Sequence, residues 1–127
     1  MGFNSDQDLM PSSRQRRGGL AEDQAVLFLR QKGFSILGRH VTSRYGEIDI
    51  LAKDGETIVA VEVKARWNEH YGRAIESVTD RKLNKIMAAL EEAMSKLRLT
   101  DQAMRIDVIT VELDGIKHVP GVTLRGR

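Results

Sequence analysis

Apolar residues near the start of the chain recur at the intervals of a helix. Segment 20–32 carries acidic residues in its first turn and basic residues in its last, and Gly33 follows as a C-cap. Its apolar face consists of Ala21, Ala25, Phe28 and Leu29. Residues 1–17, in contrast, contain few apolar residues and show no periodicity. We therefore expect a flexible N-terminal arm over 1–17 and one domain over 18–127.

Three apolar segments that follow are typical of strands. Segments 34–41, 45–53 and 57–65 are rich in aliphatic and β-branched residues. Asp54 and Gly55 separate the last two segments, and this dipeptide favours a tight turn. We expect these two strands to form an antiparallel hairpin.

The C-terminal half predicts one long helix and a second hairpin. Segment 77–99 can begin with Ser77 or Thr79 as its N-cap. Its apolar stripe consists of Leu83, Ile86, Met87, Leu90, Met94 and Leu97. Two strands, 104–113 and 116–124, then surround another Asp-Gly dipeptide. The order α-β-β-β-α-β-β predicts an α/β fold with a mixed central β-sheet flanked by helices.

Four charged residues interrupt the apolar pattern of the central hairpin. Glu47 and Asp49 share one face of the first strand, because side chains alternate along a strand. Glu62 and Lys64 take the same face of the hairpin from the second strand. The other face is aliphatic throughout: Ile48, Ile50, Ala52, Val59, Val61, Val63 and Ala65. We expect this aliphatic face to be core.

The turn decides which charged residues lie opposite one another. A two-residue turn formed by the Asp-Gly dipeptide pairs Lys53 with Glu56. In that register Asp49 lies diagonal to Glu62, whereas a four-residue loop sets the two directly opposite. Opposed side chains lie about 5 Å apart and diagonal ones roughly 7–8 Å, so both registers gather the carboxylates.

Two explanations of the charged face remain open. It can be a solvated outer face on which Lys64 pairs across the strands with Glu62 or Glu47. It can also bind a divalent cation, with Lys64 as a fixed positive charge beside the ion. The nearly continuous apolar sequence around Glu62 favours burial on both faces, and buried charges need partners.

Overall composition narrows the class of protein. The 127 residues suffice for one domain, and the absence of cysteine excludes disulfides and thiolate metal sites. No apolar run is long enough to span a bilayer, so we expect a cytoplasmic protein. The net charge of +2 indicates a polyanionic partner only weakly. His40, His70 and His118 lack zinc-site spacing, and Arg105 with Asp107 is interpreted as a structural ion pair.

The order of the charged residues resembles the PD-(D/E)XK nuclease superfamily, in which an acid in one strand precedes Glu-x-Lys in the next. The segment GEIDILAKDGETIVAVEVKAR is similar, more closely, to the signature of the YraN-like family. That family is related to archaeal Holliday-junction resolvases and is predicted to contain endonucleases. The resemblance covers most of 20–111, but Ala21 stands where the family usually has Gly, and His40 where it often has Asn.

The resemblance implies a metal-dependent catalytic site. Asp49 and Glu62 match the metal ligands of the superfamily, and the Val63 carbonyl would complete the site for Mg²⁺ or Mn²⁺. Lys64 matches the lysine that positions or activates the attacking water, and we expect the acids to keep it protonated. Two further acids match catalytic positions of the family: Glu22 and Glu47.

Basic residues gather around this predicted site. Between residues 64 and 85 bases outnumber acids, and Trp67, His70 and Tyr71 lie among them. Basic side chains can bind phosphate, and an aromatic ring can stack on an unpaired base, although for Trp67 we favour packing on the domain. The nucleic-acid-binding candidates are Arg39, Arg66, Arg73 and Lys82.

The leading interpretation is a magnesium-dependent endonuclease that hydrolyses phosphodiester bonds of DNA, and the resolvase resemblance extends it to branched or junction DNA. One alternative is a non-catalytic nucleic-acid-binding module on the same fold. Another is a protein-interaction domain whose hairpin acids are solvated. A resolvase acting on a two-fold symmetric junction would be a homodimer.

Overall fold

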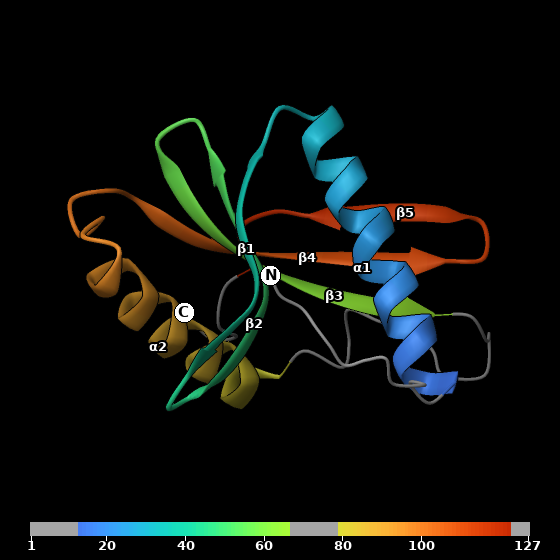
Figure 1. Ribbon diagram of the computed structural model, residues 1–127, viewed down its shortest axis with the longest axis horizontal. Helices are drawn as coiled ribbons and strands as arrows, with labels where there is room; N and C mark the ends of the chain where they lie inside the picture. Colours follow the sequence, from blue (N-terminus) through green and yellow to red (C-terminus); the bar gives the residue numbers. More distant parts are fainter. Residues whose placement is uncertain (1–12, 67–78, 123–127) are drawn as a thin grey trace, which may run out of the picture.

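The computed structural model describes residues 13–66 and 79–122 of the chain, with side chains from residue 19 onward. Its elements follow the predicted order (Figure 1). They are α1 (Ser13–Gln31), β1 (Ser35–Ser43), β2 (Gly46–Asp54), β3 (Thr57–Arg66), α2 (Asp80–Lys96), β4 (Met104–Glu112) and β5 (Gly115–Val119). The α/β fold is therefore confirmed.

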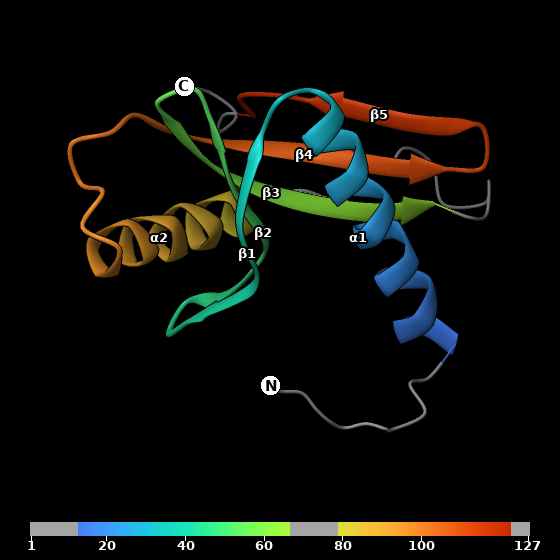
Figure 2. The same cartoon turned by 45° about the horizontal axis from the view of Figure 1, so that its top comes forward.

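The strands form one mixed sheet in the order β1-β2-β3-β4-β5. Neighbouring strands are antiparallel except β3 and β4, which run parallel and are connected through α2. In β1 the pairing with β2 shifts between Ile36 and Gly38, which makes a β-bulge at the edge of the sheet. Figures 1 and 2 show α2 beside the β1–β2 hairpin and α1 alongside β3, β4 and β5.

Each face of the sheet is covered by one helix. Leu51, Ile58 and Ala60 pack with the apolar stripe of α2. Residues of opposite parity, including Ile50 and Val59, pack with α1. Both sides of the central hairpin are therefore core. Of the four charged residues that interrupt its apolar pattern, Glu62 is buried, Asp49 and Lys64 are half-buried, and Glu47 is exposed.

The register of the central hairpin differs from the two-residue turn predicted at Asp54-Gly55. Asp54 itself pairs with Thr57, and Lys53 pairs with Ile58 rather than with Glu56. Gly55 adopts a φ of 60° as the first turn residue, a left-handed conformation that favours glycine. The observed register is the one expected for a four-residue loop, in which Asp49 lies opposite Glu62.

Two predicted apolar positions lie elsewhere than expected. Ile48 packs with the α2 core although Ile50, two residues on, packs with the α1 core. The β1–β2 hairpin bends at its far end, so simple alternation fails there (Figure 1). Leu97 is exposed because it is the C-cap residue, where α2 has already ended.

The helix ends also refine the sequence analysis. Helix α1 begins at Ser13, inside the segment expected to be an arm, although apolar periodicity starts only near residue 20. Gly18 and Gly19 disfavour helix and conceal this first part of it in the sequence. Thr79 is confirmed as the N-cap of α2: its side chain accepts a hydrogen bond from the Lys82 backbone N–H at 3.2 Å. Strand β5 ends before Pro120, which lacks an N–H for pairing.

Candidate active site

The candidate site lies where β2 and β3 stop pairing. The last backbone pair is Ile50 with Val61. Beyond it, the Asp49 Oδ2 atom accepts a hydrogen bond from the Val63 N–H at 2.8 Å. The N–H and C=O of one strand residue face the same neighbour, so the Val63 carbonyl is oriented toward the same gap. Asp49, Glu62 and the Val63 backbone thus converge at one point.

The electrostatics of this point favour a cation. Burial raises the pKa of Asp49 to about 7, and the negative charge of Glu62 acts in the same direction. Glu22 adds to the effect, whereas the hydrogen bond from Val63 opposes it. A positive ion beside the carboxylates would remove the unfavourable charge on Asp49.

Two lysines flank Glu62, which is buried. Its Oε2 atom lies 3.2 Å from the Lys64 Nζ atom and 2.7 Å from the Lys82 Nζ atom. Burial lowers the pKa of Lys64, and the neighbouring Lys82 lowers it further. Burial also acts to lower the pKa of Lys82, but hydrogen bonds to Glu62 and Lys64 raise it overall. Glu62 acts to raise the pKa of Lys64, as expected, but burial and Lys82 outweigh it, whereas the pKa of Lys82 is raised.

Glu22 and Glu47 are joined by a residue that the sequence analysis set aside. The His40 Nε2 atom lies 3.0 Å from a Glu22 carboxylate oxygen, and its Nδ1 atom lies 3.0 Å from one of Glu47. The hydrogen bond to Glu47 raises the pKa of His40. Its backbone is left-handed, with a φ of 51°. His40 thereby ties helix α1 to the start of β2.

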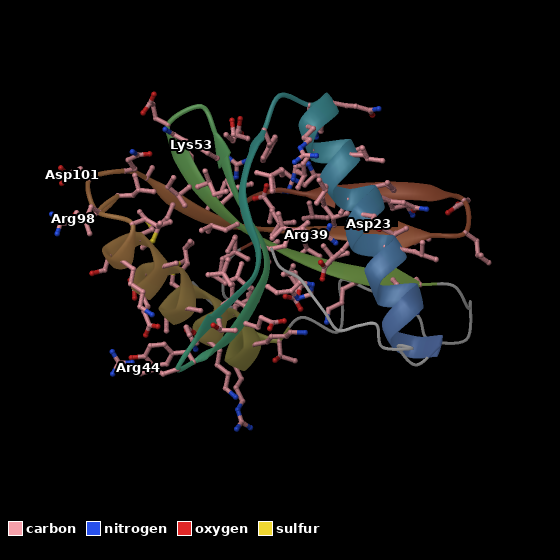
Figure 3. All side chains as sticks on the ribbon, in the orientation of Figure 1. Asp23, Arg39, Arg44, Lys53, Arg98 and Asp101 are labelled. Carbon is pink, nitrogen blue, oxygen red and sulfur yellow. The ribbon has the colours of Figure 1, made fainter. Side chains whose placement is uncertain are left out.

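The residues predicted to bind phosphate differ in whether they lie near Asp49 and Glu62. The Arg39 guanidinium lies 3.1 Å from Glu22 and 2.9 Å from Asp23, and Figure 3 shows Arg39 and Asp23 side by side between β1 and α1. Lys82 contacts Glu62, as described above, and Arg66 ends β3. Arg73 lies outside the described residues, as do Trp67, His70 and Tyr71.

A cavity of about 180 Å³ adjoins the site. It is lined by Tyr45, Gly46, Glu47, Asp49, Glu62, Lys82, Lys85, Ile86 and Ala89. Tyr45 was missed in the sequence analysis, although it directly precedes the GEID segment. Within 13–66 and 79–122, no three His, Asp or Glu side chains converge as a complete metal site. Asp49, Glu62 and the Val63 carbonyl could nevertheless hold Mg²⁺, which binds few carboxylates and keeps several waters.

A second charged cluster lies on the α1 side of the sheet. The fully buried Asp107 receives hydrogen bonds from Arg105 Nε at 2.9 Å and from the Gly121 N–H at 3.0 Å. The His118 Nε2 atom lies 2.8 Å from its other oxygen. The Arg105–Asp107 ion pair is thus present, and all its contacts anchor strands and the segment after β5.

Among the described helices, none is long and apolar enough to cross a membrane.

One solved structure, titled "Structure of EndoMS-dsDNA2 complex", is 21% identical to the chain with a TM-score of 0.43. The likeness covers 82% of this chain and 38% of that one.

Sequence comparison identifies closer relatives. A UPF0102 protein of Persephonella marina is 38% identical over 81% of this chain and 89% of its own length. One of Geobacter metallireducens is 41% identical over 81% of this chain and 88% of its own. The family model described as "Uncharacterised protein family UPF0102" matches residues 21–111, which contain both strands of the candidate site. The chain therefore belongs to the UPF0102 family, the YraN-like family that its signature resembles.

Proposed function

We propose that this chain is a metal-dependent endonuclease that hydrolyses phosphodiester bonds of DNA. One observation carries the proposal: Asp49 and Glu62 lie together at the end of β2–β3 pairing, where burial and mutual repulsion raise the pKa of Asp49 to about 7. Lys64 contacts Glu62 at the same point. Such a carboxylate pair with a lysine suits phosphoryl chemistry at a divalent cation.

Each residue of the site would have a separate role in hydrolysis. Asp49, Glu62 and the Val63 carbonyl would hold Mg²⁺, and the ion when bound lowers the pKa of water and neutralises charge on the phosphate. Lys64 would orient the attacking water by donating a hydrogen bond to its oxygen, and its ammonium would stabilise the negative charge that develops on the phosphate. Water attacks phosphorus, the P–O bond to the leaving oxygen breaks, and a proton passes to that oxygen.

The surrounding residues would bind and orient the DNA. Lys82 contacts Glu62 at 2.7 Å and lines the cavity, so its ammonium would be available to a substrate phosphate. Arg39 and Arg66 would add further contacts to phosphate, as would Arg73, which lies outside the described residues. Glu22 and Glu47, joined through His40, would position the strand that carries Asp49.

A cleavage assay tests the proposal. Purified protein is incubated with single-stranded, duplex and four-way junction DNA in Mg²⁺, Mn²⁺ or EDTA. We expect cutting that requires the metal and falls at least about 100-fold in Asp49→Asn, Glu62→Gln and Lys64→Ala, the usual scale for one catalytic group. Glu56→Gln is the matched control, because Glu56 is an exposed acid in the turn at the other end of the same hairpin.

Three results would contradict parts of the proposal. Activity that persists in Asp49→Asn would indicate a contaminating nuclease. Metal-dependent cutting that survives Lys64→Ala would remove the role of Lys64. Salt-sensitive DNA binding without any cutting would favour the non-catalytic binding module, while faster cutting of the four-way junction than of the duplex would support a branched substrate.

A further inference from the structure

The turn between β1 and β2 carries an exposed aromatic residue, Tyr45. The Ser43 Oγ atom accepts a hydrogen bond from the Tyr45 N–H at 3.0 Å and donates one to the Gly46 carbonyl at 2.8 Å. Gly46 adopts a φ of 133°, which a side chain would disfavour. The tip is therefore closed by its own hydrogen bonds, and the Tyr45 side chain remains 44% exposed.

Arg44 contacts both this ring and helix α2. Its guanidinium carbon lies 5.5 Å from the centre of the Tyr45 ring, within the range of a cation–π contact. Its Nε atom lies 3.1 Å from the Glu92 carboxylate on α2. Figure 3 shows Arg44 at the hairpin tip, next to α2. Arg44 thus links the ring to α2 through one cation–π contact and one ion pair.

Tyr45 lies at the boundary between two hollows of the surface. On one side is the 180 Å³ cavity that contains Asp49, Glu62, Lys82 and Lys85. On the other is a groove of about 560 Å³ between the hairpin tip and α2, which Tyr45 also lines. The groove has balanced charges, since Arg44 and Lys96 face Glu91 and Glu92. The cavity has two lysines beside three carboxylates, including Glu47, so a cation bound by the carboxylates would be needed to attract phosphate there.

We propose that Tyr45 stacks on an unpaired base of the nucleic acid, next to the bond that is cut. This inference rests on the proposed function and specifies its substrate as DNA with an unstacked nucleotide at the site. In a duplex each base face is covered by its neighbours, so an aromatic side chain can stack only on a base that has left the helix. The lysines beside Asp49 would hold the backbone, and the base would turn toward the ring.

Base stacking can be measured without cleavage. A duplex with one unpaired 2-aminopurine is titrated with the Asp49→Asn protein, and the same strand fully paired is the reference. Stacking on Tyr45 should quench the fluorescence and make the unpaired substrate bind more tightly. Tyr45→Ala in the same background should lose the quenching and reduce the preference for the unpaired substrate about tenfold. Tyr45→Phe should keep both, because it keeps the ring.

Leu113→Ala is the matched control, because Leu113 is 67% exposed on the β4–β5 turn and lines neither of the two hollows. It should change neither quenching nor preference. If Tyr45→Ala keeps the quenching and the preference while its thermal unfolding matches that of the parent protein, the stacking inference is wrong and the nuclease proposal stands. If the wild-type chain binds neither the paired nor the unpaired DNA, the inference and the nuclease proposal are both wrong. If it cuts full duplex and unpaired DNA equally, the inference alone is wrong.

Discussion

The Asp49 carboxylate accepts the Val63 N–H at 2.8 Å, so a side chain replaces the backbone hydrogen bond that would have continued the β2–β3 ladder. This exchange separates the two strands at their ends and leaves room between them. It also keeps a buried carboxylate at the point where Glu62 and Glu22 repel it. At this site the folded protein therefore keeps an unfavourable repulsion between buried carboxylates.

Asp49→Asn should stabilise the metal-free protein at alkaline pH. The folded protein raises the pKa of Asp49 from 3.8 to about 7, so ionisation opposes folding as the pH rises between these values. The free energy of unfolding of the variant, relative to wild type, should therefore increase from pH 5 to pH 8. We expect at least about 1 kcal/mol, since each pKa unit corresponds to about 1.4 kcal/mol. Urea unfolding in EDTA measures this, and an equal difference at both pH values would contradict it.

Metal binding should release a proton and strengthen with pH. Because a ligating carboxylate must be ionised, the affinity for Mn²⁺ should rise from pH 5.5 to about 7 and then level off. Calorimetry in two buffers of different ionisation enthalpy counts the released protons. Asp49→Asn should lose both the affinity and the release, whereas Glu56→Gln should retain them. Affinity that does not vary with pH would exclude Asp49 as a ligand.

Asp107→Asn should destabilise the fold by about 3 kcal/mol, since removing one partner of a buried ion pair leaves the other uncompensated. Burial opposes the charge of Asp107, yet hydrogen bonds from Arg105, Gly121 and His118 bring its pKa below the usual value. Its contribution is therefore complete above about pH 4 and is lost as the pH falls through the folded pKa. Chemical unfolding at pH 7 and pH 3 should show a large difference from wild type at pH 7 and a smaller one at pH 3.

Thr79→Ala should reduce stability by about 1 kcal/mol because the Lys82 N–H loses its acceptor at the start of α2. Thr79→Ser, which keeps the hydroxyl, should be close to wild type. Thr100→Ala is a suitable control, since Thr100 is exposed in the turn before β4 and should change stability by less than about 0.5 kcal/mol. Thermal unfolding measures all three, and equal losses for Thr79→Ala and Thr100→Ala would contradict the capping role.

The order of elements could be predicted because each is set by local periodicity. The nearly continuous apolar sequence of 57–65 and the stripe from Leu83 to Met94 depend only on which faces are buried. The register is harder to predict, since both turn geometries put the same residues on the same faces of the hairpin, and in the observed one Gly55 is the first turn residue with a positive φ. Ile48 shows where parity fails: a bend in the hairpin moves it to the other core.

The candidate site could be predicted in part. Asp49, Glu62 and Lys64 share a short stretch of sequence, so strand geometry alone brings them together. Lys82 contacts Glu62 only because α2 crosses between β3 and β4, and no local pattern encodes that approach. The link from Glu22 through His40 to Glu47 likewise depends on how α1 packs on β1. Long-range contacts of this kind arise from the packing of complete elements.

The bulge in β1 affects the tendency of this protein to aggregate in concentrated solution. An outermost strand offers a row of open peptide groups to which another chain can add, and long additions of that kind lead to aggregates. The extra residue between Ile36 and Gly38 disturbs the spacing of that row, so an incoming strand would lose its match after a few residues. The bulge should thus protect the protein against aggregation by addition of strands to the β1 edge.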